Sequence, residues 1–262
     1  HGVKVDARIP IEVGHHAENL GYLRSKAERM AHLLSFREQV PQSHDFDFLD
    51  PLVSQLRLRR SGSQSRPWVT LVYAQTMDGK IFADQSSTNP GLARFLTLQH
   101  DAVLQEGKRA VPGLPLATGS ERFPLQVVLD PELEYVWDSK CLGDLNERLL
   151  LLARSADPIK QAQLLETGVG VDFLPWSTAG HVDVPALLKV LVERGMTTVM
   201  VEAGPDLFAA FVRARAVDFC IASIVPEVRG EGVALSDGFA IRACEYQVLG
   251  SQLIAFGPVD FK

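Results

Sequence analysis

The feature that most constrains this chain is the alternation of short apolar runs with helical segments from residue 66 to the end. Runs rich in β-branched and apolar residues predict strands, whereas apolar residues at helical spacing predict helices between them. The predicted strands cover residues 69–74, 101–105, 125–130, 148–153, 170–175, 197–204 and 217–228. Alternating strands and helices form crossover units, so we expect a largely parallel sheet with helices on both faces.

The helices predicted between these strands cover residues 89–100, 183–195 and 205–217. The second of them has a clear start and a clear end. Asp183 can accept hydrogen bonds from the first turn, Pro185 suits that turn, and Gly195 suits the end of the helix.

Composition excludes several classes of protein. The chain has 262 residues, 46% of them apolar and 22% charged, which is ordinary for a globular protein. Its net charge of −6 gives no overall attraction to nucleic acid or to an anionic membrane. No apolar run reaches the roughly 18 residues of a membrane span. Three widely spaced cysteines indicate reduced thiols and a cytoplasmic protein, and they provide neither a disulfide framework nor a metal site.

Polar residues follow two of the predicted strands. Thr76 and Asp78 come just after the strand at 69–74, and Glu202 ends the strand before Gly204. Ligands of open parallel sheets bind outside the carboxyl ends of the strands, so we expect Asp78 and Glu202 to face one cleft. The helix that begins at Pro205 presents backbone N–H groups suited to a phosphate. The alternative is that these residues only form ordinary turns.

Four segments of the chain carry a resemblance to a known family. They are RPWVTLVYAQTMDGKI, RFLTLQHDAVL, LQVVLDPEL and VMVEAGPDLFAAFVRARAVDFCIASIVPEVRG. In order and spacing they resemble the pyrimidine reductases of riboflavin biosynthesis, over residues 66–262. The resemblance implies a dihydrofolate-reductase-like α/β fold with a mainly parallel sheet, and a homodimer. It also implies NADPH-dependent reduction of a ribosylaminopyrimidine 5′-phosphate, a small nucleotide-like substrate, to its ribitylamino form.

The resemblance also implies which residues form the site. Ala74 matches the backbone position at the nicotinamide end of the cofactor. Thr76, Asp78 and Glu202 match positions at the substrate. The positions that match the cofactor-phosphate corner are Ala203, Gly204, Pro205, Asp206 and Leu207.

The chain departs from the family pattern after HDAVL. The family reads Val-Gly-x-x-Thr there, followed by Asp, Pro and a substrate-binding Arg, whereas this chain reads QEGKRAVPGLPLATGS. An ungapped alignment places Arg109 at the threonine, Gly113 at the aspartate and Ser120 at the arginine, and Thr97 takes the place of an earlier arginine. Residues available as replacement phosphate partners are Lys108, Arg109 and Arg122. Two alternatives therefore stay open: a reductase for another small heterocycle, or a non-catalytic module.

The first part of the chain carries a second resemblance. A short strand at residues 3–13 and an amphipathic helix at residues 17–36 are predicted there as an appendage to the fold. Residues 8–34 are similar to the carboxyl-terminal tail of GTP cyclohydrolase II. We therefore expect residues 1–36 to be such a tail in a fusion protein, followed by a linker at residues 37–65 with one packed turn. The basic cluster at residues 57–66 is interpreted as part of this solvated linker. Two adjacent histidines at 15 and 16 predict a surface turn, and His100 and His181 predict ordinary helix-end or loop positions.

Overall fold

The computed structural model describes residues 43–62, 64–82, 89–107, 124–134, 148–155, 158–167, 169–177, 180–234 and 238–261. The tail segment predicted at residues 1–36 lies outside these ranges. So do the departures from the family pattern between residues 108 and 123, including Lys108, Arg109, Gly113, Ser120 and Arg122.

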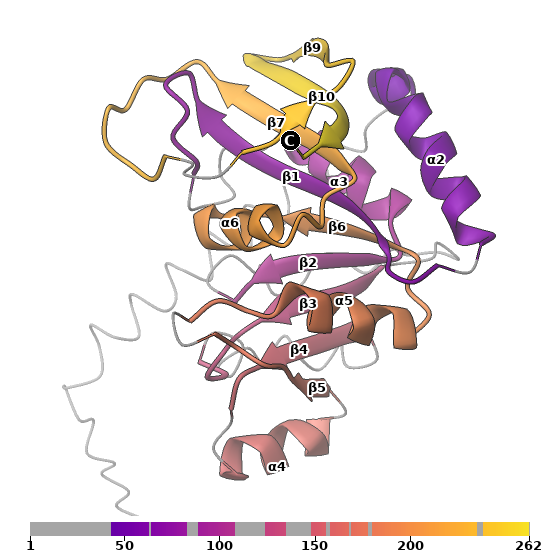
Figure 1. The fold of residues 1–262 in the computed structure, drawn as a ribbon, viewed down its shortest axis with the longest axis vertical. Helices are drawn as coiled ribbons and strands as arrows, with labels where there is room; N and C mark the ends of the chain where they lie inside the picture. The colour runs from indigo at the N-terminus through magenta and orange to yellow at the C-terminus, as the bar shows by residue number, and fades with distance from the viewer. Residues whose placement is uncertain are drawn as a thin grey trace, which may run out of the picture. The chain divides into compact units, whose positions relative to one another are not determined.

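The described strands form one sheet, which runs from β5 at one edge to β8 at the other (Figure 1). Its strands are β1 (Trp68–Thr76), β2 (Ala102–Glu106), β3 (Leu125–Leu129), β4 (Leu149–Ala153), β5 (Gly170–Phe173), β6 (Thr198–Glu202), β7 (Phe219–Val225), β8 (Ala240–Ile241), β9 (Glu245–Leu249) and β10 (Gln252–Asp260). The order is β5-β4-β3-β2-β6-β1-β7-β10-β8, and β9 pairs with β10. All pairings among β1 to β7 are parallel, and β10 is antiparallel to β7, β8 and β9. The predicted fold class, a mainly parallel sheet flanked by helices, is confirmed.

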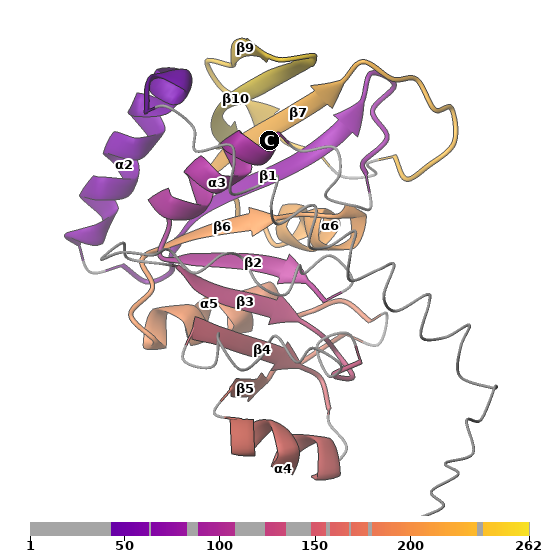
Figure 2. The ribbon, with the colours of Figure 1, turned by 180° about the vertical axis from the view of Figure 1, so that it is seen from behind.

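Helices cover both faces of this sheet because side chains alternate along each strand (Figures 1 and 2). Leu71 and Tyr73 pack with α5 (Val184–Glu193) and α6 (Pro205–Arg213), and we call this side the α6 face. Val72 packs with α2 (Asp50–Arg60) and with α3 (Pro90–Gln99) on the other side, the α3 face. Helix α4 (Pro158–Thr167) contributes Leu164 to a smaller cluster with β3 and β4.

The helix boundaries follow the local sequence. The Asp183 side chain accepts a hydrogen bond from Ala186 N–H at 2.9 Å, and Gly195 ends α5 with a φ of +77°. The Asn89 side chain likewise accepts a hydrogen bond from Leu92 N–H at the start of α3. The start and end predicted for the second helix are therefore confirmed.

The linker predicted at residues 37–65 needs correction. Residues 43–60 form a 3-10 helix, η2 (Ser43–Leu49), followed by α2 (Asp50–Arg60). Leu49, Leu52 and Leu56 recur at helical spacing and are fully buried on the α3 face. The basic cluster is also more ordered than predicted, because Arg60 pairs with Asp101 at 3.2 Å and Arg66 pairs with Asp218 at 2.7 Å. This segment therefore belongs to the core rather than to a solvated connector.

No helix among the described residues has both the length and the apolar character needed to cross a membrane.

His100 is a buried polar residue at the end of α3, as the sequence predicted for its position. It is 2% exposed, and its two ring nitrogens lie 2.7 Å from Leu96 O and 2.8 Å from Thr70 Oγ1. Burial disfavours the charged imidazolium and lowers the pKa of His100 to about 4. The imidazole is therefore neutral in the folded protein at pH 7.

This burial predicts a loss of stability in mild acid. Between pH 6.5 and 4 the unfolded state binds a proton at His100 that the folded state does not bind, so stability falls as the pH is lowered. The loss at pH 5 should be about 2 kcal/mol. Urea unfolding at pH 7 and pH 5 measures it, and a His100→Gln variant should lose less stability between these pH values than the unmodified protein. Equal losses would contradict the prediction.

Candidate functional site

The carboxyl edge of the sheet is where the topology creates a crevice. Strand β6 enters the sheet between β2 and β1, which precede it in the chain. The helix after β1 lies on the α3 face, and the helix after β6 lies on the α6 face (Figures 1 and 2). Connections that leave neighbouring strands toward opposite faces open a crevice at the ends of those strands, where ligands of such folds bind.

The polar residues after β1 form a tight turn. Thr76 N–H donates to Lys80 O at 3.0 Å, and Gly79 N–H donates to Thr76 O at 3.0 Å. Gly79 has a φ of +75°, a conformation that glycine adopts without a steric cost. The turn brings residues 80–82 back along β1, where Phe82 N–H donates to Ala74 O at 3.0 Å. Ala74 is buried, and its carbonyl oxygen already accepts the hydrogen bond from Phe82 N–H.

Asp78 connects this turn to the segment that follows β7. Its carboxylate accepts hydrogen bonds from the Thr76 hydroxyl at 2.5 Å, from Gly230 N–H at 2.8 Å and from Arg229 N–H at 3.2 Å. The Thr76 hydroxyl contributes most to lowering the pKa of Asp78 to about 2. Asp78 is therefore ionised at neutral pH and holds two segments together, which is the turn-forming role that the sequence left open.

Glu202 lies deeper, at the carboxyl end of β6. It pairs in register with Val72 and is 6% exposed, and it accepts a hydrogen bond from Gln105 Nε2 at 2.5 Å. By strand alternation Glu202 and Gln105 face the α3 side, as Met200 and Val103 do two residues earlier. Thr76 lies four residues after Val72 on β1, so its side chain points to the same α3 face. The structure thus places Thr76, Gln105 and Glu202 on one face of the sheet.

The corner between β6 and α6 has the geometry of a helix start. Gly204 is the N-cap residue with an extended backbone, φ −81° and ψ −178°, and Phe208 N–H donates the first bond of the helix to Gly204 O. Ala203 is fully buried and is not among the non-glycine residues with positive φ, so its methyl group causes no backbone strain. The N–H groups that precede Phe208 point out of the helix end, where the helix dipole favours an anion.

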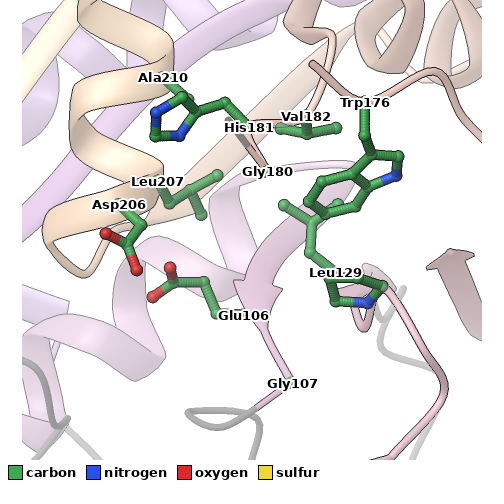
Figure 3. Close-up of a pocket in the computed structure, with 11 residues that line it drawn as sticks. Glu106, Gly107, Leu129, Trp176, Gly180, His181, Val182, Asp206, Leu207 and Ala210 are labelled. Atoms are coloured by element: carbon green, nitrogen blue, oxygen red, sulfur yellow. The ribbon is translucent and has the colours of Figure 1, made fainter. Parts of the chain in front are cut away.

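A cavity of about 330 Å³ opens beside this corner, on the α6 face (Figure 3). Its lining residues come from the ends of β2 and β3, the start of α6 and the loop before α5. They are Glu106, Gly107, Leu129, Pro131, Trp176, Gly180, His181, Val182, Asp206, Leu207 and Ala210. The cavity is thus positioned to receive a ligand that contacts the start of α6.

The cavity includes only part of the predicted site. Asp206 and Leu207 line it, whereas Thr76, Asp78 and Glu202 do not. Glu202 ends β6 and Asp78 follows β1, so both lie at the carboxyl edge of the sheet. Asp78 is six residues beyond Val72, which pairs with Glu202. The single cleft expected for the two carboxylates stays a prediction.

Sequence reasoning missed Glu106, and it treated His181 only as a loop residue. The signal for Glu106 was present, because Glu106 ends a fully buried strand just as Glu202 does. Trp176 and His181 carried no such signal. They reach the cavity through a short hairpin in which Ser177 N–H donates to His181 O and Trp176 pairs with Val182.

Comparison with known proteins gives a consistent result. Residues 67–257 match the family described as the RibD C-terminal domain. The riboflavin biosynthesis protein RibD of Aquifex aeolicus is 27% identical over 213 residues, which are 74% of this chain and 58% of that protein. RibD of Chlamydia trachomatis is 28% identical over 183 residues, 63% of this chain and 47% of that protein. The chain spans about half the length of these curated relatives.

Solved structures are similar in fold. The riboflavin biosynthesis reductase Rib7 of Saccharomyces cerevisiae superposes with a TM-score of 0.58 at 19% identity, covering 80% of this chain and 99% of that one. A pyrimidine reductase-like protein of Corynebacterium diphtheriae gives a TM-score of 0.61 at 18% identity, covering 75% and 93%. At these identities the similarity establishes the fold alone.

The Asp78 contacts predict a measurable shift on substitution. Thr76→Val removes the hydroxyl that contributes most to the lowered pKa, so the pKa of Asp78 should rise from about 2 toward 3.8. It should stay below 3.8 because the backbone N–H groups of Arg229 and Gly230 still donate to the carboxylate. NMR titration of the carboxyl carbon measures the pKa. Thr76→Ser, which keeps the hydroxyl, serves as the control, and an unchanged pKa in Thr76→Val would refute this account.

Proposed function

The chain belongs to the family of RibD C-terminal domains, and from that premise we propose that it is a pyrimidine reductase of riboflavin biosynthesis. The substrate proposed is a ribosylaminopyrimidine 5′-phosphate. Its ring-opened sugar gains a hydride at C1′ and a proton at the neighbouring heteroatom, which gives the ribitylamino product. A nicotinamide dinucleotide supplies the hydride when it is bound, and the family resemblance implies NADPH.

The observation that carries this proposal is the corner that joins β6 to α6 within the matched region. A buried glutamate ends the strand, a glycine without a side chain follows, and a nine-residue helix begins at Pro205. The adjoining cavity is lined by Asp206 and Leu207 from the same helix start, and in this proposal it receives another part of the dinucleotide. These residues fit a pyrophosphate because the start of the helix offers N–H donors and a favourable dipole.

The polar groups on the α3 face suit the other reactant. Glu202 is held by Gln105 and can accept a hydrogen bond from a hydroxyl or amino group. The turn that Asp78 fixes lies at the end of β1 and is bonded to the segment that follows β7. In this proposal Glu202 binds and orients the pyrimidine or its sugar, and Asp78 holds the surrounding segments in place.

A second candidate is a reductase for a different small heterocycle. It is favoured by Thr97, which is described on α3 and stands where the family places an arginine. Without that guanidinium a phosphate on the substrate loses a charged partner. Fold similarity alone does not separate these two candidates.

Turnover distinguishes the candidates directly. The purified chain is mixed with a reduced nicotinamide dinucleotide and the ribosylaminopyrimidine 5′-phosphate, and mass spectrometry follows the gain of two hydrogens. Glu202→Gln should slow product formation by about tenfold or more, because an amide accepts hydrogen bonds less strongly than a carboxylate. Dinucleotide binding without conversion of this pyrimidine would shift the assignment to another heterocycle.

The homodimer implied by the family resemblance is also part of this proposal. The outer face of β9 and β10 exposes Tyr246, Val248 and Leu253, which together offer an apolar surface to a second copy. Light scattering of the purified chain would contradict the dimer if it gave the mass of a monomer.

Substitution at the α6 corner tests the dinucleotide position. Gly204 has an extended backbone that any residue can adopt, so Gly204→Val is compatible with the local conformation. Its side chain should block the approach of a pyrophosphate and weaken dinucleotide binding by about thirtyfold or more, with Gly204→Ala between the two. Fluorescence titration measures affinity, and thermal unfolding confirms that each variant is folded. Unchanged affinity in folded Gly204→Val would contradict this position.

A further inference from the structure

The basic cluster at residues 57–66 lies beside a second pocket, which is separate from the cavity at α6. The pocket has a volume of about 360 Å³, within the range of about 300–1,000 Å³ that is typical of ligand sites. Its lining comes from the carboxyl end of α2, the connection to β1, the first residue of β1 and the residue before β7. Figure 2 shows this amino edge of the parallel sheet, with the end of α2 beside the start of β1. The start of α6 is at the opposite edge.

The carboxylate in the lining is already balanced. Asp218 accepts hydrogen bonds from two nitrogens of the Arg66 guanidinium, at 2.7 Å and 2.8 Å, and a third from Val69 N–H at 2.8 Å. Arg66 Nη1 also donates to Pro67 O at 3.0 Å. A guanidinium has five N–H groups and these contacts use three of them, so Arg66 keeps further donors for a ligand.

Arg59 contributes a positive charge that no described carboxylate balances. Its guanidinium carbon lies 4.7 Å from the centre of the Trp68 ring, and its side chain forms no ion pair within the part of the chain that the structure describes. The attraction between the cation and the face of the indole ring holds the guanidinium in place. The Arg59 carbonyl oxygen, near the end of α2, already accepts a hydrogen bond from Gln64 Nε2 at 3.2 Å. The lining therefore carries a net positive charge.

These groups suit a phosphate better than a carboxylate. Arg59 and Arg66 donate from two different segments, and the exposed hydroxyl of Ser65 lies in the connection between them. A phosphate has three strong acceptor oxygens and about −1.5 to −2 charges at pH 7. A carboxylate has two oxygens in one plane and a single charge. A tetrahedral anion can therefore accept from all three side chains at once.

We propose that Arg59, Arg66 and Ser65 bind a phosphate group in this pocket, either as the free ion or as a monoester. Trp68 positions the Arg59 guanidinium and does not contact the ligand. The inference is independent of the proposed function, because the pocket lies at the opposite edge of the sheet from Glu202 and the start of α6.

An NMR titration of the purified full chain tests the inference. The indole N–H resonance of Trp68 is assigned as the one that disappears in Trp68→Phe. Inorganic phosphate should shift this resonance to saturation, because a phosphate bound to Arg59 changes the electric field at the ring that Arg59 covers. Arg59→Gln should weaken binding by about tenfold or more, and Ser65→Ala by about threefold. A shift that does not saturate, or an unchanged affinity in both variants, would overturn the inference.

Two controls locate the bound ion. Arg57→Gln removes the same charge from an exposed position on α2 outside the pocket, so it should leave the affinity unchanged. Gly204→Val changes the start of α6 at the other edge and should also leave it unchanged. Equal losses in Arg57→Gln and Arg59→Gln would reduce the effect to general charge and overturn the inference. Loss of binding in Gly204→Val with retention in Arg59→Gln would place the phosphate at α6, which overturns the inference and leaves the reductase assignment standing.

Ribose 5-phosphate and acetate separate the possible ligands. Tighter binding of ribose 5-phosphate than of inorganic phosphate would assign the site to a monoester, and the reverse would assign it to the free ion. Either result supports a phosphate site. Acetate presents a carboxylate and should bind about tenfold or more weakly than the better of the two phosphates. Equal affinity for acetate would contradict the choice of a phosphate.

Discussion

The pairing of β1 on both of its edges is the constraint on which the site depends. Strand β1 is hydrogen-bonded to β6 through residues 68–72 and to β7 through residues 70–76, all in parallel. Strand β6 ends opposite Val72, whereas β1 continues to Thr76. Residues 80–82 fold back along this last part of β1 and form the backbone hydrogen bonds that β6 no longer provides. Because β6 is the shorter strand, Glu202 is buried beside the last residues of β1, and α6 begins three residues after it. The turn that contains Asp78 lies farther out, beyond the end of β1.

Strand alternation then divides the polar residues between the two faces of the sheet. Gln105 and Glu106 are neighbours on β2, yet Gln105 bonds Glu202 on the α3 face and Glu106 lines the cavity on the α6 face. The same strand therefore contributes polar side chains to both faces of the sheet. Thr76 and Glu202, which the family resemblance assigns to the substrate, lie on the first face. The start of α6, which suits a pyrophosphate, adjoins the cavity on the second.

The sequence predicted the features that depend on local patterns. The central parallel strands and the start and end of α5 follow from apolar periodicity and from residues such as Asp183 and Gly195. The contacts of Asp78 could not be predicted in this way, because Gly230 is 152 residues away along the chain. Helix α2 was predicted as linker because basic residues dominate its carboxyl-terminal turn. Its apolar side chains are buried only by their contact with the sheet, which the local sequence does not reveal. The antiparallel β9–β10 hairpin was also not predicted.

The two faces of the sheet also keep the surroundings of Glu106 and Glu202 apart. A charge at Glu106 acts on whatever fills the cavity, whereas Glu202 is held by Gln105 on the other side of the sheet. The two carboxylates end neighbouring strands, but their side chains point in opposite directions, so substitution of one leaves the contacts of the other in place. The cavity on the α6 face and the Gln105–Glu202 contact on the α3 face can therefore be altered separately by substitution.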